Sequence, residues 1–208
     1  MLSLALLPAL VLLANDASEG WTEVTKTDGF TVYSRVESGT TIAEMKVVGP
    51  IDAPPHDVWK TVRDYPNYAA RMPYTDEGKL MGSEGGDKVL YFYSVVNAPL
   101  VDRRDYCIRI VDESVWNEGK GYLLMTWRET PKCPSPREGL VRVKATHGSW
   151  KLEPTANGTK TNATYVIYTD PGGDIPKWIV NQGNSTVVGN IFATTRKWAV
   201  KERAAASR

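Results

Sequence analysis

The chain has 208 residues and a formal net charge of +1. This length suits one domain with a substantial core, and the near-neutral charge gives no general attraction to nucleic acid. The sequence also lacks a glycine-rich phosphate loop and a basic tract with interleaved aromatic residues, so we expect no nucleic-acid partner. Seven tryptophans and ten tyrosines accompany three phenylalanines, and such polar rings suit a cavity wall as well as a core.

The N-terminal segment Met1–Ala14 is apolar but shorter than the roughly 20 residues that a membrane-spanning helix needs. It resembles the apolar region of a secretory signal peptide, with cleavage after Ala14 or Ala17, although no basic residue precedes it. The alternative is a buried N-terminal helix. We expect residues 1–19 to be a signal peptide, residues 20–208 to form one domain, and the protein to be periplasmic or secreted.

Strand patterns dominate the next part of the chain. Trp21–Val36 predicts a hairpin, Thr41–Val48 a third strand, and His56–Asp64 a short amphipathic helix that ends before a proline. Alternating patterns separated by turn residues then predict six antiparallel strands. These strands are Lys79–Ser83, Lys88–Val96, Asp102–Asp112, Gly121–Glu129, Leu140–Glu153 and Asn162–Thr169.

One connection differs from the others. Thr130–Gly139 contains three prolines and is too long for a tight hairpin, so it is either a lid loop or a plain surface loop. Its Cys133 and the strand residue Cys107 are the only cysteines. An exported protein could join them, but they lie in different elements, and we expect them to be unpaired.

The C-terminal part begins with a turn and continues as a long helix. Asp170–Pro176 contains two prolines and two glycines, and Lys177–Arg208 contains no proline. The apolar residues of this helix form one arc, with Gly183 and Gly189 allowing close approach of a partner or ligand. Strands followed by a long helix indicate an α+β fold with helices on one face of a curved sheet.

Several motifs in this order resemble the START (steroidogenic acute regulatory protein-related lipid-transfer) domain. They are Arg104-Asp105-Tyr106, Gly139-Leu140-Val141-Arg142-Val143, His147-Gly148, the Asp170–Pro176 turn and Asn181. The resemblance implies a helix-grip fold, in which a curved antiparallel sheet wraps around the C-terminal helix and encloses a tunnel for one lipid. It also implies that no cofactor is needed.

Strand alternation combined with this resemblance predicts the residues of the tunnel wall. Cys107 and Arg109 are expected to point away from the ligand, opposite to Tyr106. The predicted ligand-binding residues are Tyr91, Tyr93, Val95, Tyr106, Ile108, Ile110, Trp127, His147, Val187 and Ile191. Sterol-binding members of the family carry a buried acid–arginine pair, and the matching positions here are Tyr91 and Ile110. The family's sterol assignment therefore does not carry over directly.

The sequence provides little for catalysis. Two histidines and two cysteines without short spacing do not form a metal site, and no Gly-x-Ser-x-Gly motif is present. We expect a non-enzymatic, monomeric lipid carrier, gated by Thr130–Gly139 and the C-terminal helix, that contacts membranes transiently. The alternative is a polyketide cyclase or aromatase, which related helix-grip proteins exemplify. In that case His147 would act with a tyrosine of the cavity as an acid–base pair.

Overall fold

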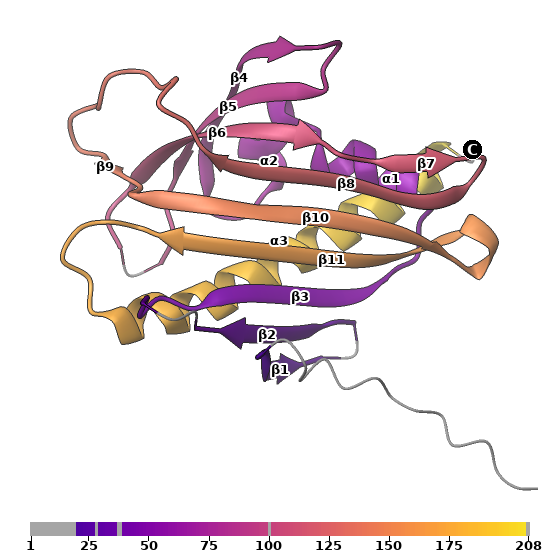
Figure 1. Cartoon of the computed structure of the whole chain (residues 1–208), viewed down its shortest axis with the longest axis horizontal. Helices are drawn as coiled ribbons and strands as arrows, with labels where there is room; N and C mark the ends of the chain where they lie inside the picture. The colour runs from indigo at the N-terminus through magenta and orange to yellow at the C-terminus, as the bar shows by residue number, and fades with distance from the viewer. Residues whose placement is uncertain (1–19, 28, 37–38, 100, 207–208) are drawn as a thin grey trace, which may run out of the picture.

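The computed structural model in Figure 1 describes residues 20–27, 29–36, 39–99 and 101–206, and for Lys177, Trp178, Gln182 and Ala206 the backbone alone. The predicted signal peptide lies outside these residues and stays a prediction. The described strands form one eleven-stranded sheet with the main order β1-β2-β3-β11-β10-β8-β6-β5-β4. The strands are β1 (Thr22–Lys26), β2 (Thr31–Arg35), β3 (Glu44–Ile51), β4 (Thr75–Glu84), β5 (Val89–Val96), β6 (Arg104–Asp112), β7 (Val115–Asn117), β8 (Lys120–Glu129), β9 (Val141–Arg142), β10 (Ala145–Thr155) and β11 (Lys160–Asp170).

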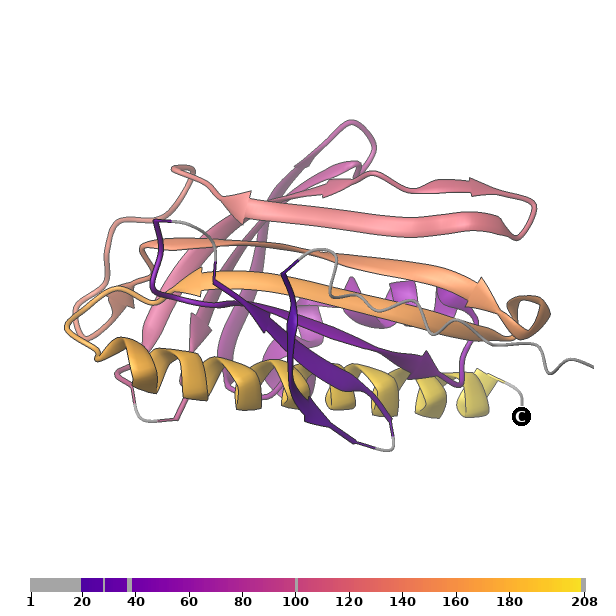
Figure 2. The same ribbon diagram turned by 60° about the horizontal axis from the view of Figure 1, so that its bottom comes forward.

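The helices lie on one side of this sheet, and α3 (Lys177–Ala206) runs along its concave face (Figure 2). The shorter helices are α1 (Pro55–Val62), α2 (Tyr68–Arg71) and the 3-10 turns η2 (Tyr65–Asn67) and η3 (Ala156–Gly158). The predicted α+β helix-grip architecture is confirmed. Among the described helices, none is both long and apolar enough to cross a membrane.

Apolar side chains of α3 attach this helix to the sheet. Val188, Phe192 and Ala199 are buried, as the helical pattern predicts. The ring of Phe192 lies 5.3 Å from Phe30 and 5.7 Å from Trp150, between centroids, at distances typical of aromatic pairs. The helix therefore packs against the inner face of β2 and β10 along this line.

The turn that precedes α3 also forms as predicted. Gly172 and Gly173 have φ values of 68° and 73°, in the left-handed region that favours glycine. The Gly172 N–H donates a 3.1 Å hydrogen bond to Oδ1 of Asp170, and the Pro176 carbonyl accepts from Val180 at the start of the helix. The chain therefore reverses from β11 into α3 within a few residues.

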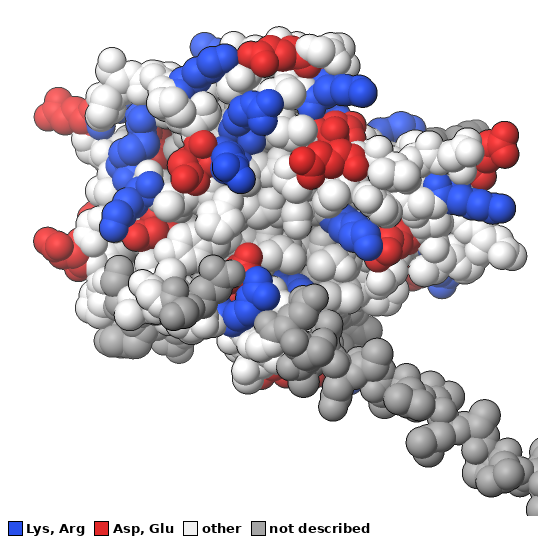
Figure 3. Space-filling model, in the orientation of Figure 1, with Lys and Arg blue, Asp and Glu red and all other residues white. Residues whose placement is uncertain are grey.

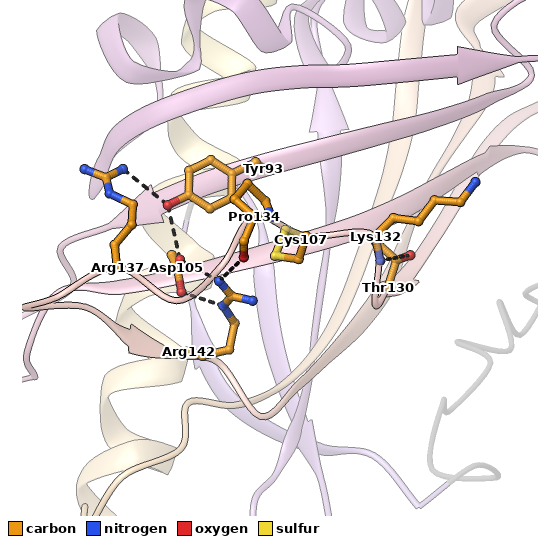
Figure 4. Close-up of a disulfide and its surroundings, with 9 residues drawn as sticks. Tyr93, Asp105, Cys107, Thr130, Lys132, Pro134, Arg137 and Arg142 are labelled. Atoms are coloured by element: carbon orange, nitrogen blue, oxygen red, sulfur yellow. Dashed lines mark hydrogen bonds and ion pairs between the residues drawn. A yellow bond between two sulfur atoms is a disulfide. The ribbon is translucent and has the colours of Figure 1, made fainter.

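The prediction that the two cysteines are unpaired is wrong. Cys107 on β6 and Cys133 form a disulfide (Figure 4), and their Cα atoms are 5.6 Å apart. Cys107 does point away from the concave face, as predicted. Only the three-dimensional path of the connection from β8 to β9 brings the second cysteine over this outer face, so spacing along the sequence could not reveal the bond.

The connection Thr130–Gly139 is consequently fastened to the outside of the sheet. Besides the disulfide, Arg137 donates to Glu77 on β4 at 2.7 Å, and Lys132 donates to Glu84 at 3.1 Å. Figure 3 shows this outer face, on which basic and acidic side chains alternate. The loop thus belongs to the charged outer surface, on the opposite side of the sheet from α3.

Candidate functional site

A cavity of about 240 Å³ lies between the concave face of the sheet and α3. Strands β5, β6, β8, β10 and β11 provide its roof, and one side of α3 from Ile179 to Thr195 provides its floor. Two connecting segments, 72–75 and 98–101, also reach the wall, although residue 100 itself is outside the described part of the chain. The wall is mostly apolar, as expected for a site that binds a hydrophobic molecule.

The structure brings six of the ten predicted ligand-binding residues together around this cavity. Tyr106, Ile108 and Ile110 alternate along β6 and share its inner face, as predicted. The other three come from β8 and α3. They are Trp127, Val187 and Ile191.

The predicted inner face of β5 is wrong. In the register of β5 with β6, Ser94 lies opposite Tyr106 and Phe92 lies opposite Ile108. Residues directly opposite each other on neighbouring strands share a face of the sheet, so the even-numbered residues of β5 point inward. Phe92 and Val96 line the cavity in place of the predicted residues, which are Tyr91, Tyr93 and Val95.

Those three residues contact the outer loop instead. Lys132 of the loop donates to the Tyr91 hydroxyl at 3.0 Å, and Arg137 donates to the Tyr93 hydroxyl at 3.3 Å. Val95 is buried in a small cluster that contains the disulfide. Both faces of β5 are therefore apolar, because the loop covers one and α3 and the cavity cover the other.

His147 also lies outside the cavity. Its ring is exposed and stacks on Tyr168, with 5.0 Å between the centroids. Its neighbour Thr146 faces the cavity instead, and the hydroxyls of Thr146 and Thr169 are 3.1 Å apart. The residue of β10 that faces the cavity here is therefore Thr146, and not the histidine that was expected to hydrogen-bond a ligand.

The structure explains why a glycine follows this histidine, at position 148. A Cβ atom on Gly148 would lie 2.5 Å from the ring of Trp127 and 2.2 Å from the Val166 carbonyl oxygen. Gly148 therefore allows Trp127 to lie flat against β10. The Trp127 and Trp150 rings both stack on Tyr165, at centroid distances of 6.0 and 4.5 Å, and together form an aromatic part of the wall.

The predicted lid does not line the cavity. No residue of Thr130–Gly139 belongs to the wall, because the disulfide and the ion pairs hold this segment on the outer face. Outside the strands, the described part of the wall consists of Val62 of α1, Tyr65 of η2, Tyr68 of α2, residues 72–74, 98–99 and 101, Val143, Pro171 and α3. Of the two gating elements expected from the sequence, α3 alone is in position.

The cavity wall contains one charged residue among those that the structure describes, Arg104 at the start of β6. It is 4 % exposed, and burial lowers the pKa of its guanidinium. The alternation that points Tyr106, Ile108 and Ile110 inward places Arg104 on the same face. In the sequence, Arg104 belongs to the run Asp102-Arg103-Arg104-Asp105, and four charges in a row usually indicate a surface.

The remaining polar side chains of the described wall are tyrosines, threonines, the carboxamide of Asn184 and the indoles of Trp127 and Trp150. Burial raises the pKa values of Tyr65, Tyr106 and Tyr165, so these phenols stay neutral at physiological pH. Thr195 on α3 is fully buried, and its Oγ1 has no hydrogen-bond partner within the described chain. No group of three or more potential metal ligands occurs in the described residues.

Comparisons with known proteins agree with this geometry. An uncharacterized protein of Pseudomonas aeruginosa is 29% identical over 168 residues, 80% of each chain. Bovine phosphatidylcholine transfer protein is 25% identical over 176 residues, which are 83% of this chain and 80% of that protein.

Solved structures show the same arrangement. The STAR-related lipid transfer protein of Xanthomonas axonopodis superposes with a TM-score of 0.77 at 27% identity, covering 86% of this chain and 98% of that one. The Zhui aromatase/cyclase of Streptomyces shares the fold alone, with a TM-score of 0.54 at 16% identity over 79% of this chain and 95% of that one. The START domain family matches residues 2–204, and the chain therefore belongs to the START domain family.

Proposed function

We propose that the protein is a carrier that holds one lipid-like ligand in the cavity between the sheet and α3. The observation that carries this proposal is the composition of the wall, which is largely apolar and, over the described residues, contains no histidine, lysine, aspartate or glutamate. Burial of apolar ligand surface contributes about 25 cal/mol per Å², which is the main source of affinity in such a site. The phosphatidylcholine transfer relatives support the same function.

The size of the cavity indicates that ligand uptake involves movement. Its volume of about 240 Å³ lies below the roughly 300–1,000 Å³ of common ligand pockets, so a two-chain lipid needs additional space. The sheet strands are held by ladders of hydrogen bonds, whereas no such ladder holds α3 or residues 72–73, 98–99 and 101. We propose that these parts move apart to admit the ligand, during transient contact with a membrane.

The alternative function, a polyketide cyclase or aromatase, has less support from the site. Of the acid–base groups considered for it, His147, Tyr91 and Tyr93 lie outside the cavity wall. Tyr106 remains, and its raised pKa makes it a poor base at neutral pH. We therefore propose a non-enzymatic role.

We also propose that the protein is exported, to the periplasm or outside the cell. Two independent features support this: the apolar N-terminal segment and the Cys107–Cys133 disulfide. Disulfides persist in oxidising compartments and are rare in the cytosol. Cell fractionation of the full-length protein, with mass determination of its N-terminus, tests this proposal, and an uncleaved cytosolic product would contradict it.

Native mass spectrometry of the protein purified from its source organism tests the carrier function. We expect one copurifying hydrophobic molecule per chain, released unchanged by organic extraction. Gly183→Leu, which fills space beside the wall, should copurify with less of it, whereas Gly183→Ala should not differ from the wild type. Conversion of an added polyketide chain, with no bound lipid in any preparation, would support the cyclase instead.

A further inference from the structure

Arg104 is buried, and no carboxylate of the described chain forms an ion pair with it. Its Nε donates to the Pro171 carbonyl at 3.1 Å, its Nη2 reaches the Gly172 carbonyl at 3.5 Å, and its Nη1 donates to the Asp102 carbonyl. All three acceptors are neutral backbone groups. No ion pair with Arg104 occurs in the described chain. A guanidinium has five N–H groups, so two of them have no acceptor among the described residues.

The nearest acidic residue in the sequence cannot neutralise this charge. Asp105 follows Arg104 on β6, and its side chain therefore points to the opposite face of the sheet. There its two oxygens accept from Arg142 at 2.7 and 3.0 Å, and Oδ2 also accepts from Tyr93 (Figure 4). The outer face thus contains a complete ion pair, whereas Arg104 forms none within the described chain. The charge of the exposed Asp102 acts on Arg104 only from a distance, and the lowering of its pKa by burial is the larger effect.

The surroundings of Arg104 provide further hydrogen-bond donors. Thr169, near the end of β11, lies two residues before Pro171, whose carbonyl accepts from Arg104. The hydroxyl oxygen of Thr169 is 3.1 Å from that of Thr146. Both threonines line the cavity. Because one hydroxyl donates to the other, the second hydroxyl keeps its hydrogen for another acceptor. Arginine and hydroxyl donors near an otherwise apolar wall suit an anion with a hydrocarbon tail.

We propose that Arg104 binds a single anionic group of the ligand, a carboxylate or a phosphodiester, while the hydrocarbon part of the ligand occupies the apolar remainder of the cavity. This inference rests on the proposed carrier function and adds the chemical class of the ligand. It predicts that anionic lipids bind in preference to neutral lipids with the same chains. A purely structural Arg104, which only holds the turn before α3, predicts no such preference.

The first experiment compares ligands on the wild-type protein. Palmitate and hexadecanol, and separately phosphatidylglycerol and diacylglycerol with matched chains, compete with a bound fluorescent fatty-acid analogue at pH 8. In at least one pair, we expect the anionic lipid to bind at least about tenfold more tightly than the neutral lipid. The reason is that hydrogen bonds between charged groups are stronger than those between neutral groups. A preference for palmitate identifies the carboxylate as the source, and one for phosphatidylglycerol identifies the phosphodiester.

The negative outcomes separate the two proposals. Equal affinity within both pairs would overturn the role of Arg104 and leave the carrier function intact. Failure of all four lipids to displace the probe, or of the probe to bind, would overturn the carrier function together with this inference.

A second experiment uses variants. Arg104→Gln should bind the neutral lipid as the wild type does and lose the preference for the anionic one, whereas Arg104→Lys should keep part of it. Arg103→Gln is the matched control, because Arg103 is half-exposed and pairs with Asp76 outside the cavity. Equal weakening of both ligands in Arg104→Gln would indicate a structural role only. If this variant does not fold, the wild-type comparison decides the question.

Discussion

Cys107 and Cys133 join β6 to the segment that follows β8, across 26 positions of the sequence. The bond closes a loop that would otherwise be free in the unfolded chain. Loop-closure entropy for this length corresponds to about 3.5 kcal/mol of stabilisation. The disulfide is therefore expected to be a major contributor to the stability of this part of the sheet.

Replacement of both cysteines by serine should lower the free energy of unfolding by about 3.5 kcal/mol. Urea unfolding, with the wild type under oxidising and reducing conditions as reference, measures this change. Ligand affinity at a temperature far below the transition should stay within about twofold, because no residue of the loop lines the cavity. A large loss of affinity in the folded double variant would restore the loop as a gating element.

The ion pair between Asp105 and Arg142 is a second attachment of the same region. The Asp105 side chain is 1% exposed, and that of Arg142 is 31% exposed. Asp105→Asn leaves the guanidinium without its charged partner and should lower the free energy of unfolding by about 2–3 kcal/mol, less than for a fully buried pair. Asp76→Asn, in the exposed pair with Arg103, should cost about 0–1 kcal/mol. Equal effects in the two variants would contradict the importance of burial.

The fold could be predicted from the sequence because its signals are local. Turn residues separate the strands, and the Asp170–Pro176 turn precedes one long helix. The inner face of β6 could also be predicted, since Tyr106 marks it by resemblance. β5 gave no such signal, because the outer loop buries its second face and makes both faces apolar. The pairing of Ser94 with Tyr106 shows which face of β5 points inward, and this register depends on the assembled sheet.

The position of Thr130–Gly139 on the outer face and the burial of Arg104 also could not be predicted, because both depend on the assembled sheet. The proline-rich segment has the composition of any long loop, and only its bonds to Cys107 and Glu77 show which face it covers. Arg104 lies within a run of four charged residues, which normally indicates a solvated surface. Its burial results from the turn at Pro171 and Gly172, which folds over it.

The two glycines of α3 should behave differently, although the sequence suggested the same role for both. A Cβ on Gly183 would meet no atom within 4 Å, and Gly183 lines the cavity. A Cβ on Gly189 would meet the Phe30 ring at 3.5 Å, which is ordinary contact. Alanine at either position should raise the free energy of unfolding by up to about 1 kcal/mol through helix propensity.

Leucine separates the two positions. Gly189→Leu should destabilise the protein by about 1–3 kcal/mol through overpacking against β2. Gly183→Leu should retain stability and lose ligand binding, measured by thermal unfolding and by displacement of a fluorescent lipid. Loss of binding in a folded Gly189→Leu variant, with normal binding in Gly183→Leu, would reverse the assignment.

Thr195 provides the last test, at the opposite end of the cavity from Arg104. It lies 18 residues after Lys177, or about 27 Å along α3, whereas Arg104 contacts the turn before the helix. Its buried Oγ1 has no partner in the described chain, and an unsatisfied buried hydroxyl costs about 1–3 kcal/mol. Thr195→Val keeps the shape and should therefore raise the free energy of unfolding of ligand-free protein by about 1 kcal/mol.

The same variant reports on the ligand. If the ligand places a polar group at this end, that group forms a hydrogen bond with the Thr195 hydroxyl of the wild type. Thr195→Val removes this bond and should then weaken ligand binding several-fold. Higher stability with unchanged affinity would show that only hydrocarbon reaches Thr195, which is the result we expect for a ligand whose polar group is held by Arg104. Thr194→Val, at the neighbouring position outside the cavity wall, is the control and should change neither quantity by a comparable amount. A destabilised Thr195→Val variant would contradict the absence of a partner for this hydroxyl.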